Sequence, residues 1–202
     1  MKQGGTLIAA VLLMEAAAWV SRPVVPMDPF LLLGIARSAE AMLLFFLGPW
    51  SFQGPQNRPA LVKSVVLAFA ASAIGMAALL AWFHLLRLPV FGLPRRATPP
   101  APGWALFLFT TSIASPVAEE LVFRGLIYRF LRLRLSALSA AGAVSGGFAA
   151  LHLPFGGQFL APFFGSLVFC AGYEKEKTVL APILLHVFGN LIIFLSPFWL
   201  FR

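Results

Sequence analysis

Apolar residues gather into long segments along the chain, separated by short polar or proline-rich links. The segments are residues 6–20, 29–47, 62–86, 104–128, 137–153, 159–172 and 178–198. Each is close to the length that a helix needs to cross a hydrocarbon layer of ~30 Å. Because a lipid-exposed backbone must satisfy its own hydrogen bonds, such segments are expected to be helices. The pattern therefore predicts an all-α, polytopic transmembrane helical bundle of about seven spanning helices.

The composition supports a membrane protein. Of the 202 residues, 60% are hydrophobic and only 11% are charged, whereas soluble domains are usually about one quarter charged. A soluble chain of this length could not bury so much apolar surface. The net charge of +8 would suggest nucleic acid in a soluble protein, but here Lys and Arg in the links are expected to face anionic lipid. We therefore expect membrane lipid and no nucleic acid as partners. Because the chain is short and compact, a bacterial inner (cell) membrane is the expected location.

A proline-rich connector divides the chain. Residues 88–103 contain Pro89, Pro94, Pro99, Pro100 and Pro102. Proline interrupts helices and favours a stiff, extended link. We expect residues 1–103 to hold the N-terminal transmembrane helices and this connector, and residues 104–202 to hold the core that carries the chemistry.

Ionisable side chains are few in the N-terminal apolar segments. Arg37 and Glu40 lie three residues apart, so they share a helix face and are predicted to neutralise each other. Glu15 and His84 lie in two other segments. The simplest interpretation of both is a structural or interfacial role.

The segment of residues 104–128 contains two adjacent carboxylates, Glu119 and Glu120, followed by Arg124. Two carboxylates in an apolar helix are costly if both are ionised and unpaired. Arg124 lies four residues beyond Glu120, on the same face, and can hold it as a carboxylate. Glu119 points about 100° away around the helix. It lacks that partner, so it is the carboxyl expected to gain and lose a proton as a general base.

Further polar side chains lie at comparable depths in the later helices. His152 ends one segment, and His186 and Asn190 lie four residues apart on one face of the last segment. Counted from the basic side at ~1.5 Å per residue, Glu119 and Asn190 lie ~18 Å deep, His152 ~22 Å and His186 ~12 Å. The sequence therefore predicts a site between helices of the C-terminal half, with the groups that activation of a water molecule requires.

The order and spacing of these residues resemble a known family. The motifs are Glu119-Glu120-x-x-x-Arg124, Phe148-x-x-x-His152 and His186-x-x-x-Asn190. They resemble the three motifs of the CPBP family, which contains the type II CAAX prenyl endopeptidases and the bacterial Abi-type proteins. The resemblance covers residues 104–195, about half of the chain, and no motif position departs from the family pattern.

The resemblance implies an intramembrane endopeptidase. Glu119 would activate the attacking water with help from His152. His186 and Asn190 would stabilise the oxyanion of the tetrahedral intermediate. The other two residues of the first motif, Glu120 and Arg124, would support the site.

The sequence leaves open whether the site binds a metal ion. Zinc sites commonly use histidines and a carboxylate, and His152, His186 and Glu119 could supply three ligands. The His-Glu-x-x-His spacing of zincins is absent from the sequence. Catalysis without a metal is therefore the favoured expectation, with zinc as the alternative.

The expected substrate is a membrane-anchored or lipidated protein cut near its C-terminus, as the resemblance implies. The links on one side of the predicted helices carry more Lys and Arg, and the positive-inside rule makes that side cytoplasmic. The site would then lie nearer the outer face, which favours an exported or membrane-embedded substrate.

Two other classes of protein are alternatives to a peptidase. A non-catalytic binder, such as a bacteriocin-immunity protein or scaffold, would not need all four polar residues. A transporter would be expected to show repeated halves, and the sequence has no repeat.

Overall fold

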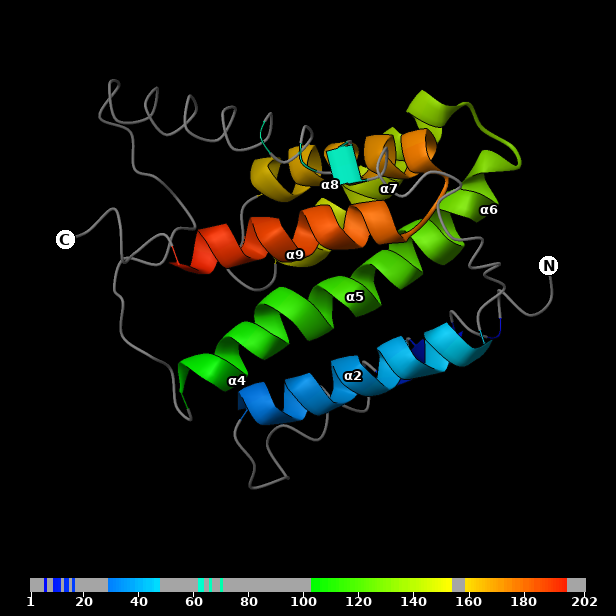
Figure 1. The fold of residues 1–202 in the computed structure, drawn as a ribbon. Coiled ribbons are helices and arrows are strands. Elements are labelled where there is room, and N and C mark those ends of the chain that lie inside the picture. Colours follow the sequence, from blue (N-terminus) through cyan, green and yellow to red (C-terminus); the bar gives the residue numbers. More distant parts are fainter. Residues whose placement is uncertain are drawn as a thin grey trace.

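The computed structural model describes residues 29–47, 103–153 and 159–195, together with scattered positions within 6–16 and 62–70. Every element assigned in these residues is a helix, as Figure 1 shows. This confirms the all-α class for the described part of the chain. The count of seven spanning helices stays a prediction. Glu15, His84, most of the 62–86 segment and nearly all of the proline-rich connector lie outside the described residues.

One continuous helix from Trp104 to Arg132 forms the centre of the described structure. It consists of α4 (Trp104–Phe109), η1 (Thr110–Ala114), α5 (Ser115–Glu120), η2 (Leu121–Tyr128) and α6 (Arg129–Arg132), of which η1 and η2 are π-helical. It spans 29 residues and, among the described helices, is the one long and apolar enough to cross a membrane. The predicted end at residue 128 was too early. The helix continues through α6, where Arg132 donates to the Leu135 carbonyl at 2.7 Å.

A proline accounts for the first π-helical turn. Pro116 stands at the second position of α5, directly after η1. Proline has no backbone N–H, and its ring clashes with the carbonyl four residues earlier in a regular α-helix. A π-helical turn places an extra residue in that turn. The long helix therefore continues past Pro116 without a break.

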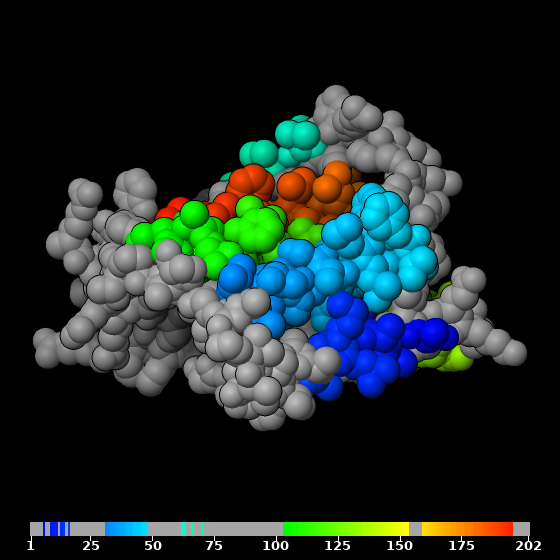
Figure 2. Space-filling model, turned by 90° about the horizontal axis from the view of Figure 1, so that it is seen from below, coloured from blue at the N-terminus to red at the C-terminus, as the bar shows by residue number. Residues whose placement is uncertain are grey.

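Helix α2 (Pro29–Leu47) has the bounds predicted from the sequence and packs against α4, η1 and α5. Figure 2 shows α2 lying alongside these segments, with α9 beyond them. A Cβ atom at Gly34 would lie 2.6 Å from Thr110 Oγ1, so the absence of a side chain permits this close approach. The predicted pair is also present, because Arg37 Nη1 donates to Glu40 Oε2 at 2.9 Å.

Three further helices cover the other side of the long helix. They are α7 (Ala137–His152), α8 (Leu160–Glu176) and α9 (Leu180–Leu195). Helix α7 packs on α8, α8 on α9, and α9 on η1 and α5. Ser136 caps α7 by accepting a hydrogen bond from the Ser139 N–H, and Lys177 ends α8 in the left-handed conformation. Helix α8 extends four residues past the predicted end, and α9 begins two residues later than predicted.

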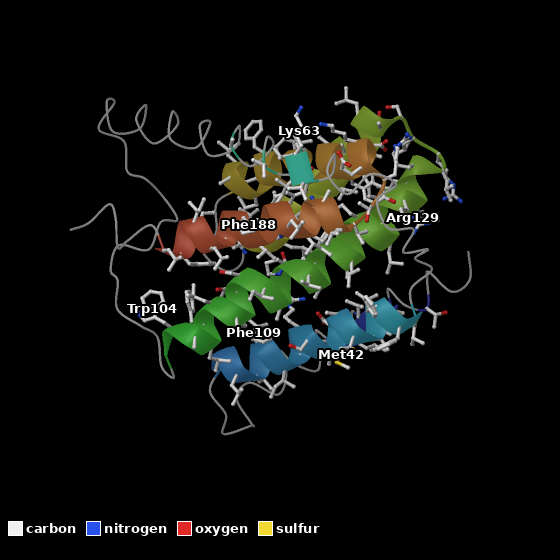
Figure 3. The ribbon with its side chains drawn as sticks, in the orientation of Figure 1. Met42, Lys63, Trp104, Phe109, Arg129 and Phe188 are labelled. Carbon is white, nitrogen blue, oxygen red and sulfur yellow. The ribbon has the colours of Figure 1, made fainter. Side chains whose placement is uncertain are left out.

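Large apolar side chains remain on the outside of the described helices. Leu138 is 81% exposed and Leu133 71%. Met42, Phe109 and Phe188 are exposed as well, and Figure 3 places them on three different helices. An apolar exterior of this kind fits contact with lipid tails rather than water. Helices α7 and α9 are apolar too, but shorter than a typical span.

Candidate active site

The carboxylate of Glu120 lies at the centre of a buried charged group. Glu120 and Arg124 are both fully buried, and Arg124 Nη1 donates to Glu120 Oε1 at 2.9 Å. This ion pair is the one predicted from the four-residue spacing. Because both partners are buried, removal of either one leaves the other charge uncompensated in a poorly polar interior.

His186 of α9 binds the same carboxylate oxygen. Its Nδ1 lies 2.8 Å from Glu120 Oε1. A carboxylate only accepts hydrogen bonds, so Nδ1 carries the hydrogen in this contact. The other ring nitrogen, Nε2, lies 3.9 Å from Glu119 Oε2. One imidazole thus lies between the two adjacent carboxylates and joins α9 to the long helix.

Glu119 differs from its neighbour in exposure. The Glu119 side chain is 19% exposed, whereas that of Glu120 is fully buried. The 3.9 Å between Glu119 and His186 is too long for a direct hydrogen bond. It is a separation at which a bridging water can bond to both atoms. Glu119 is therefore the carboxylate of the pair that solvent can reach.

The guanidinium of Arg124 is held from α7 and α8 as well. Its Nη2 donates to the Ser166 backbone carbonyl at 3.0 Å and to the Ser166 hydroxyl. Its carbon lies 5.3 Å from the ring centre of Phe148 and 5.2 Å from that of Phe169. Both distances are within the range of cation–π attraction. Two helices that lack a charged residue near this point therefore supply the surroundings of a buried cation.

Asn190 lies one turn beyond His186 on α9 and contacts the first π-helical segment. Its Nδ2 donates to the Thr111 carbonyl at 2.9 Å. π-helical turns frequently lie at functional sites, and Thr111 is part of η1. An asparagine amide has two N–H groups, so the second one can serve another acceptor.

His152 is joined to the group through Phe148. Its Nδ1 lies 2.8 Å from the Phe148 carbonyl, which only accepts, so Nδ1 carries the hydrogen and Nε2 accepts in the neutral ring. The ring centres of His152 and Phe148 are 4.6 Å apart. The Phe148 ring in turn lies 5.8 Å from the ring of His186, edge to face.

The residues that would bind zinc under the alternative, His152, His186 and Glu119, are not gathered into one set among the described residues. Among the described residues, no group of three or more His, Cys, Asp or Glu side chains could hold a metal ion. The Nδ1 atoms of His152 and His186 are both engaged, one by a backbone carbonyl and the other by Glu120. Their Nε2 atoms are therefore the ring nitrogens that a metal would use.

A second charged group lies at the basic end of the long helix. Glu174 near the end of α8 accepts from Arg132 Nε at 2.6 Å, from the Tyr128 hydroxyl at 3.0 Å and from Lys177. The hydrogen bonds from Lys177 and Arg132 lower the pKa of Glu174 to about 2. This group ties α8 to α6 beyond the apolar part of the helices.

The structure brings the predicted residues together to different degrees. Glu120, Arg124 and His186 form one hydrogen-bonded group, and Glu119 lies beside that group. His152 and Asn190 contact its edges, through Phe148 and through a backbone carbonyl of η1.

Sequence reasoning missed three residues that contact this group: Ser166, Phe169 and Thr111. Weak signals for two of them exist. Ser166 is the one hydroxyl-bearing residue in the apolar segment of residues 159–172, and Thr111 is in a row of three hydroxyl-bearing residues, 110–112. Phe169 carries no such signal, because a phenylalanine in an apolar helix is equally expected to face lipid.

One family model matches the C-terminal half of the chain. Residues 101–192 match the family model Rce1-like, described as Type II CAAX prenyl endopeptidase Rce1-like. No curated protein and no solved structure matches the chain. The matched range contains all three motifs and every predicted site residue. The match covers 92 of the 202 residues, and it supports the resemblance to the CPBP family of CAAX proteases that the motifs indicate.

Proposed function

We propose that the protein is an intramembrane endopeptidase that hydrolyses a peptide bond near the C-terminus of a membrane-anchored or lipidated protein. One observation carries the proposal. Glu119 is partly exposed and lies 3.9 Å from His186 Nε2, while the adjacent Glu120 is buried and bonded to Arg124 and His186. Two neighbouring carboxylates thus have separate tasks, one in chemistry and one in support.

The Glu119–His186 gap suits a water molecule. An oxygen atom at about 2.8 Å from each partner, an ordinary hydrogen-bond distance, fits as the apex of a triangle on the 3.9 Å base. Glu119 takes a proton from that water, and the water oxygen attacks the scissile carbonyl carbon. The π electrons of the carbonyl bond move to its oxygen, which becomes an oxyanion. When the intermediate collapses, the carbon–nitrogen bond breaks and Glu119 returns the proton to the leaving amine.

Asn190 and His186 are placed to stabilise the oxyanion in this scheme. Asn190 uses one amide N–H for the Thr111 carbonyl and has a second for the substrate. His186 donates from Nε2 when both of its ring nitrogens carry hydrogen. His152 has Nε2 as its acceptor, because Nδ1 is bound to the Phe148 carbonyl, and this atom orients the attacking water.

The proposal includes no metal. Its support is that, within the described residues, His152, His186 and Glu119 are not gathered as a group that could hold a metal ion, and that the sequence lacks the His-Glu-x-x-His spacing of zincins. The chemistry above uses only protein groups and water.

The proposed location is the bacterial inner membrane, and the proposed substrate is an exported or membrane-embedded protein. The basic residues at the ends of α6 and α8, namely Arg129, Arg132, Arg134, Lys175 and Lys177, mark the cytoplasmic side under the positive-inside rule. The site then lies toward the opposite face of the membrane.

The test is Glu119→Gln in the purified full-length protein, assayed with a panel of peptides that contain C-terminal membrane anchors. We expect kcat to fall by about 10²–10⁴-fold, the usual contribution of a general base. Glu176→Gln is the matched control, because Glu176 lies at the end of α8, ten residues beyond Ser166, and should keep normal activity. Full cleavage by Glu119→Gln would refute the proposal. Binding of a peptide by the wild-type protein without any cleavage would indicate a non-catalytic binder instead.

A further inference from the structure

Helix α8 carries none of the residues that the sequence motifs contain, yet it touches the charged group of the site at two points. Ser166 is fully buried. Its carbonyl and its hydroxyl both accept hydrogen bonds from Arg124 Nη2. The other terminal nitrogen, Nη1, donates to Glu120. The long helix therefore holds one terminal nitrogen of the guanidinium, Nη1, and α8 holds the other, Nη2.

Phe169 touches both partners of Glu120. Its ring stacks on the imidazole of His186, with ring centres 4.7 Å apart and planes inclined by 22°. The same ring lies 5.2 Å from the guanidinium carbon of Arg124. Stacked and cation–π contacts both restrict the orientation of the groups involved. Because Phe169 follows Ser166 by three residues, both side chains lie on one face of α8.

The two contacts converge on one atom. Glu120 Oε1 receives hydrogen bonds from Arg124 at 2.9 Å and from His186 at 2.8 Å. Ser166 sets the direction of the first donor, and Phe169 sets the plane of the second. A change at either position can alter the direction of His186 Nε2, which lies 3.9 Å from Glu119, without any contact with the substrate.

We propose that Ser166 and Phe169 are positioning residues of the peptidase site, which hold Arg124 and His186 in register with Glu120. This inference rests on the proposed function. It assigns to α8 a role in the reaction. The competing interpretation is that both residues serve packing alone, as buried residues of a helix bundle commonly do.

The experiment compares Ser166→Ala and Phe169→Leu with matched controls in the full-length protein. Ser145→Ala removes an equally buried hydroxyl on α7, which lies beside Cys170 and makes no hydrogen bond to Arg124. Phe163→Leu removes a ring from the same helix as Phe169, where it stacks on Phe159 with centres 5.6 Å apart. All variants are assayed with the peptide that the wild-type protein cleaves best.

A positioning role predicts a loss in kcat and not in KM. Ser166→Ala should lower kcat about tenfold, since a hydrogen bond to a charged group is lost while the carbonyl contact remains. KM should stay within about twofold. Ser166→Thr retains the hydroxyl and should recover most of kcat. The two controls should stay within about twofold of the wild type.

A readout that needs no substrate separates the two interpretations further. In protein with ¹⁵N-labelled histidine, the Nδ1 signal of His186 is assigned by its loss in His186→Gln. Ser166→Ala should shift this signal through Arg124 and Glu120, whereas Ser145→Ala should not.

The outcomes distinguish this inference from the proposed function. An unmoved His186 signal in Ser166→Ala, with kcat unchanged in both α8 variants, refutes the positioning role. If Glu119→Gln is inactive in the same assay, the proposed function then stands without it. A rise in KM alone would also overturn the inference, because it would place the residue in contact with substrate. Should Ser166→Ala fail to fold, Phe169→Leu provides the same comparison, with Phe163→Leu as its control.

Discussion

Replacement of Arg124 by methionine removes a cation that three helices hold. Methionine has a similar length and no charge, so the substitution deletes the hydrogen bonds to Glu120 and Ser166 while leaving apolar contacts with Phe148 and Phe169. Glu120 then remains fully buried with His186 as the partner of its Oε1 atom.

The expected loss of stability follows from that burial. Breaking a buried ion pair by removal of one partner costs about 3–5 kcal/mol, because the remaining charge is uncompensated. Glu119→Gln should cost at most about 1 kcal/mol, since that side chain is partly exposed and lies 3.9 Å from His186 Nε2. For a chain of this size, 1 kcal/mol corresponds to about 2–4 °C in Tm. Arg124→Met should therefore lower Tm by roughly 6–20 °C and Glu119→Gln by under about 4 °C.

The single cysteine provides the assay. Cys170 is 1% exposed and is the one cysteine of the chain. A thiol-reactive dye should therefore label it in detergent only after the helices separate. Because Cys170 lies in α8 near Arg124, loss of helical circular dichroism should be followed in parallel, so that local opening is not mistaken for unfolding.

Two comparisons test the reasoning. Arg134→Met removes an exposed arginine that lies over Phe130 and should cost under about 1 kcal/mol. The double variant Arg124→Met/Glu120→Gln should be more stable than Arg124→Met alone, because it no longer buries an unpaired charge. Equal Tm values for Arg124→Met and Glu119→Gln would refute the separation of the two carboxylates into a supporting and a reacting group.

Three other predictions concern packing, pH and metal. Gly34→Ala should destabilise by about 1–3 kcal/mol, because its Cβ would lie 2.6 Å from Thr110 Oγ1, and added Thr110→Ala should restore much of the lost Tm. The pKa of Glu174 is lowered to about 2 from an ordinary 4.5, so its contribution to stability is present above pH 4.5 and is lost as pH falls toward 2. The Tm difference between wild type and Glu174→Gln should therefore shrink over that interval. Treatment with a zinc chelator should leave kcat within about twofold.

Each of these has an opposing result. Failure of Thr110→Ala to improve the Gly34→Ala variant would show that the clash lies elsewhere. A Tm difference for Glu174→Gln that is constant from pH 6 to pH 2 would contradict the ion-pair explanation, and Glu176→Gln provides the baseline at the same helix end. Loss of cleavage on chelation, with recovery on addition of zinc, would establish metal dependence.

Local spacing was enough to predict several features. The bounds of α2 and the start of α7 follow from breaks in the apolar pattern. The Glu120–Arg124 and Arg37–Glu40 pairs follow from helical geometry alone, since residues three or four apart share a face. The helix ends at Arg132 and Glu176 were predicted too early, because charged residues at the membrane surface were interpreted as links although they continue the helices.

Contacts between helices could not be predicted in the same way. In a membrane, the lipid-facing and the buried surfaces of a helix are both apolar, so hydropathy does not show which face of α8 contacts Arg124. Ser166 and Phe169 became visible only through their partners on another helix. The π-helical turns also depend on packing and on Pro116 together, and they determine which carbonyl Asn190 meets.

The distribution of this polar group along the chain has a consequence for how the protein enters the membrane. The long helix carries Glu119, Glu120 and Arg124, and three ionisable residues near a bilayer centre cost roughly 8–10 kcal/mol on an insertion scale. Part of the compensation comes from residues synthesised later. Ser166 lies 42 positions after Arg124, and His186 lies 66 positions after Glu120. At about 5–20 residues per second, the last of these follows after roughly 3 to 13 s. We therefore expect truncation before α9 to leave the long helix poorly inserted as well as inactive.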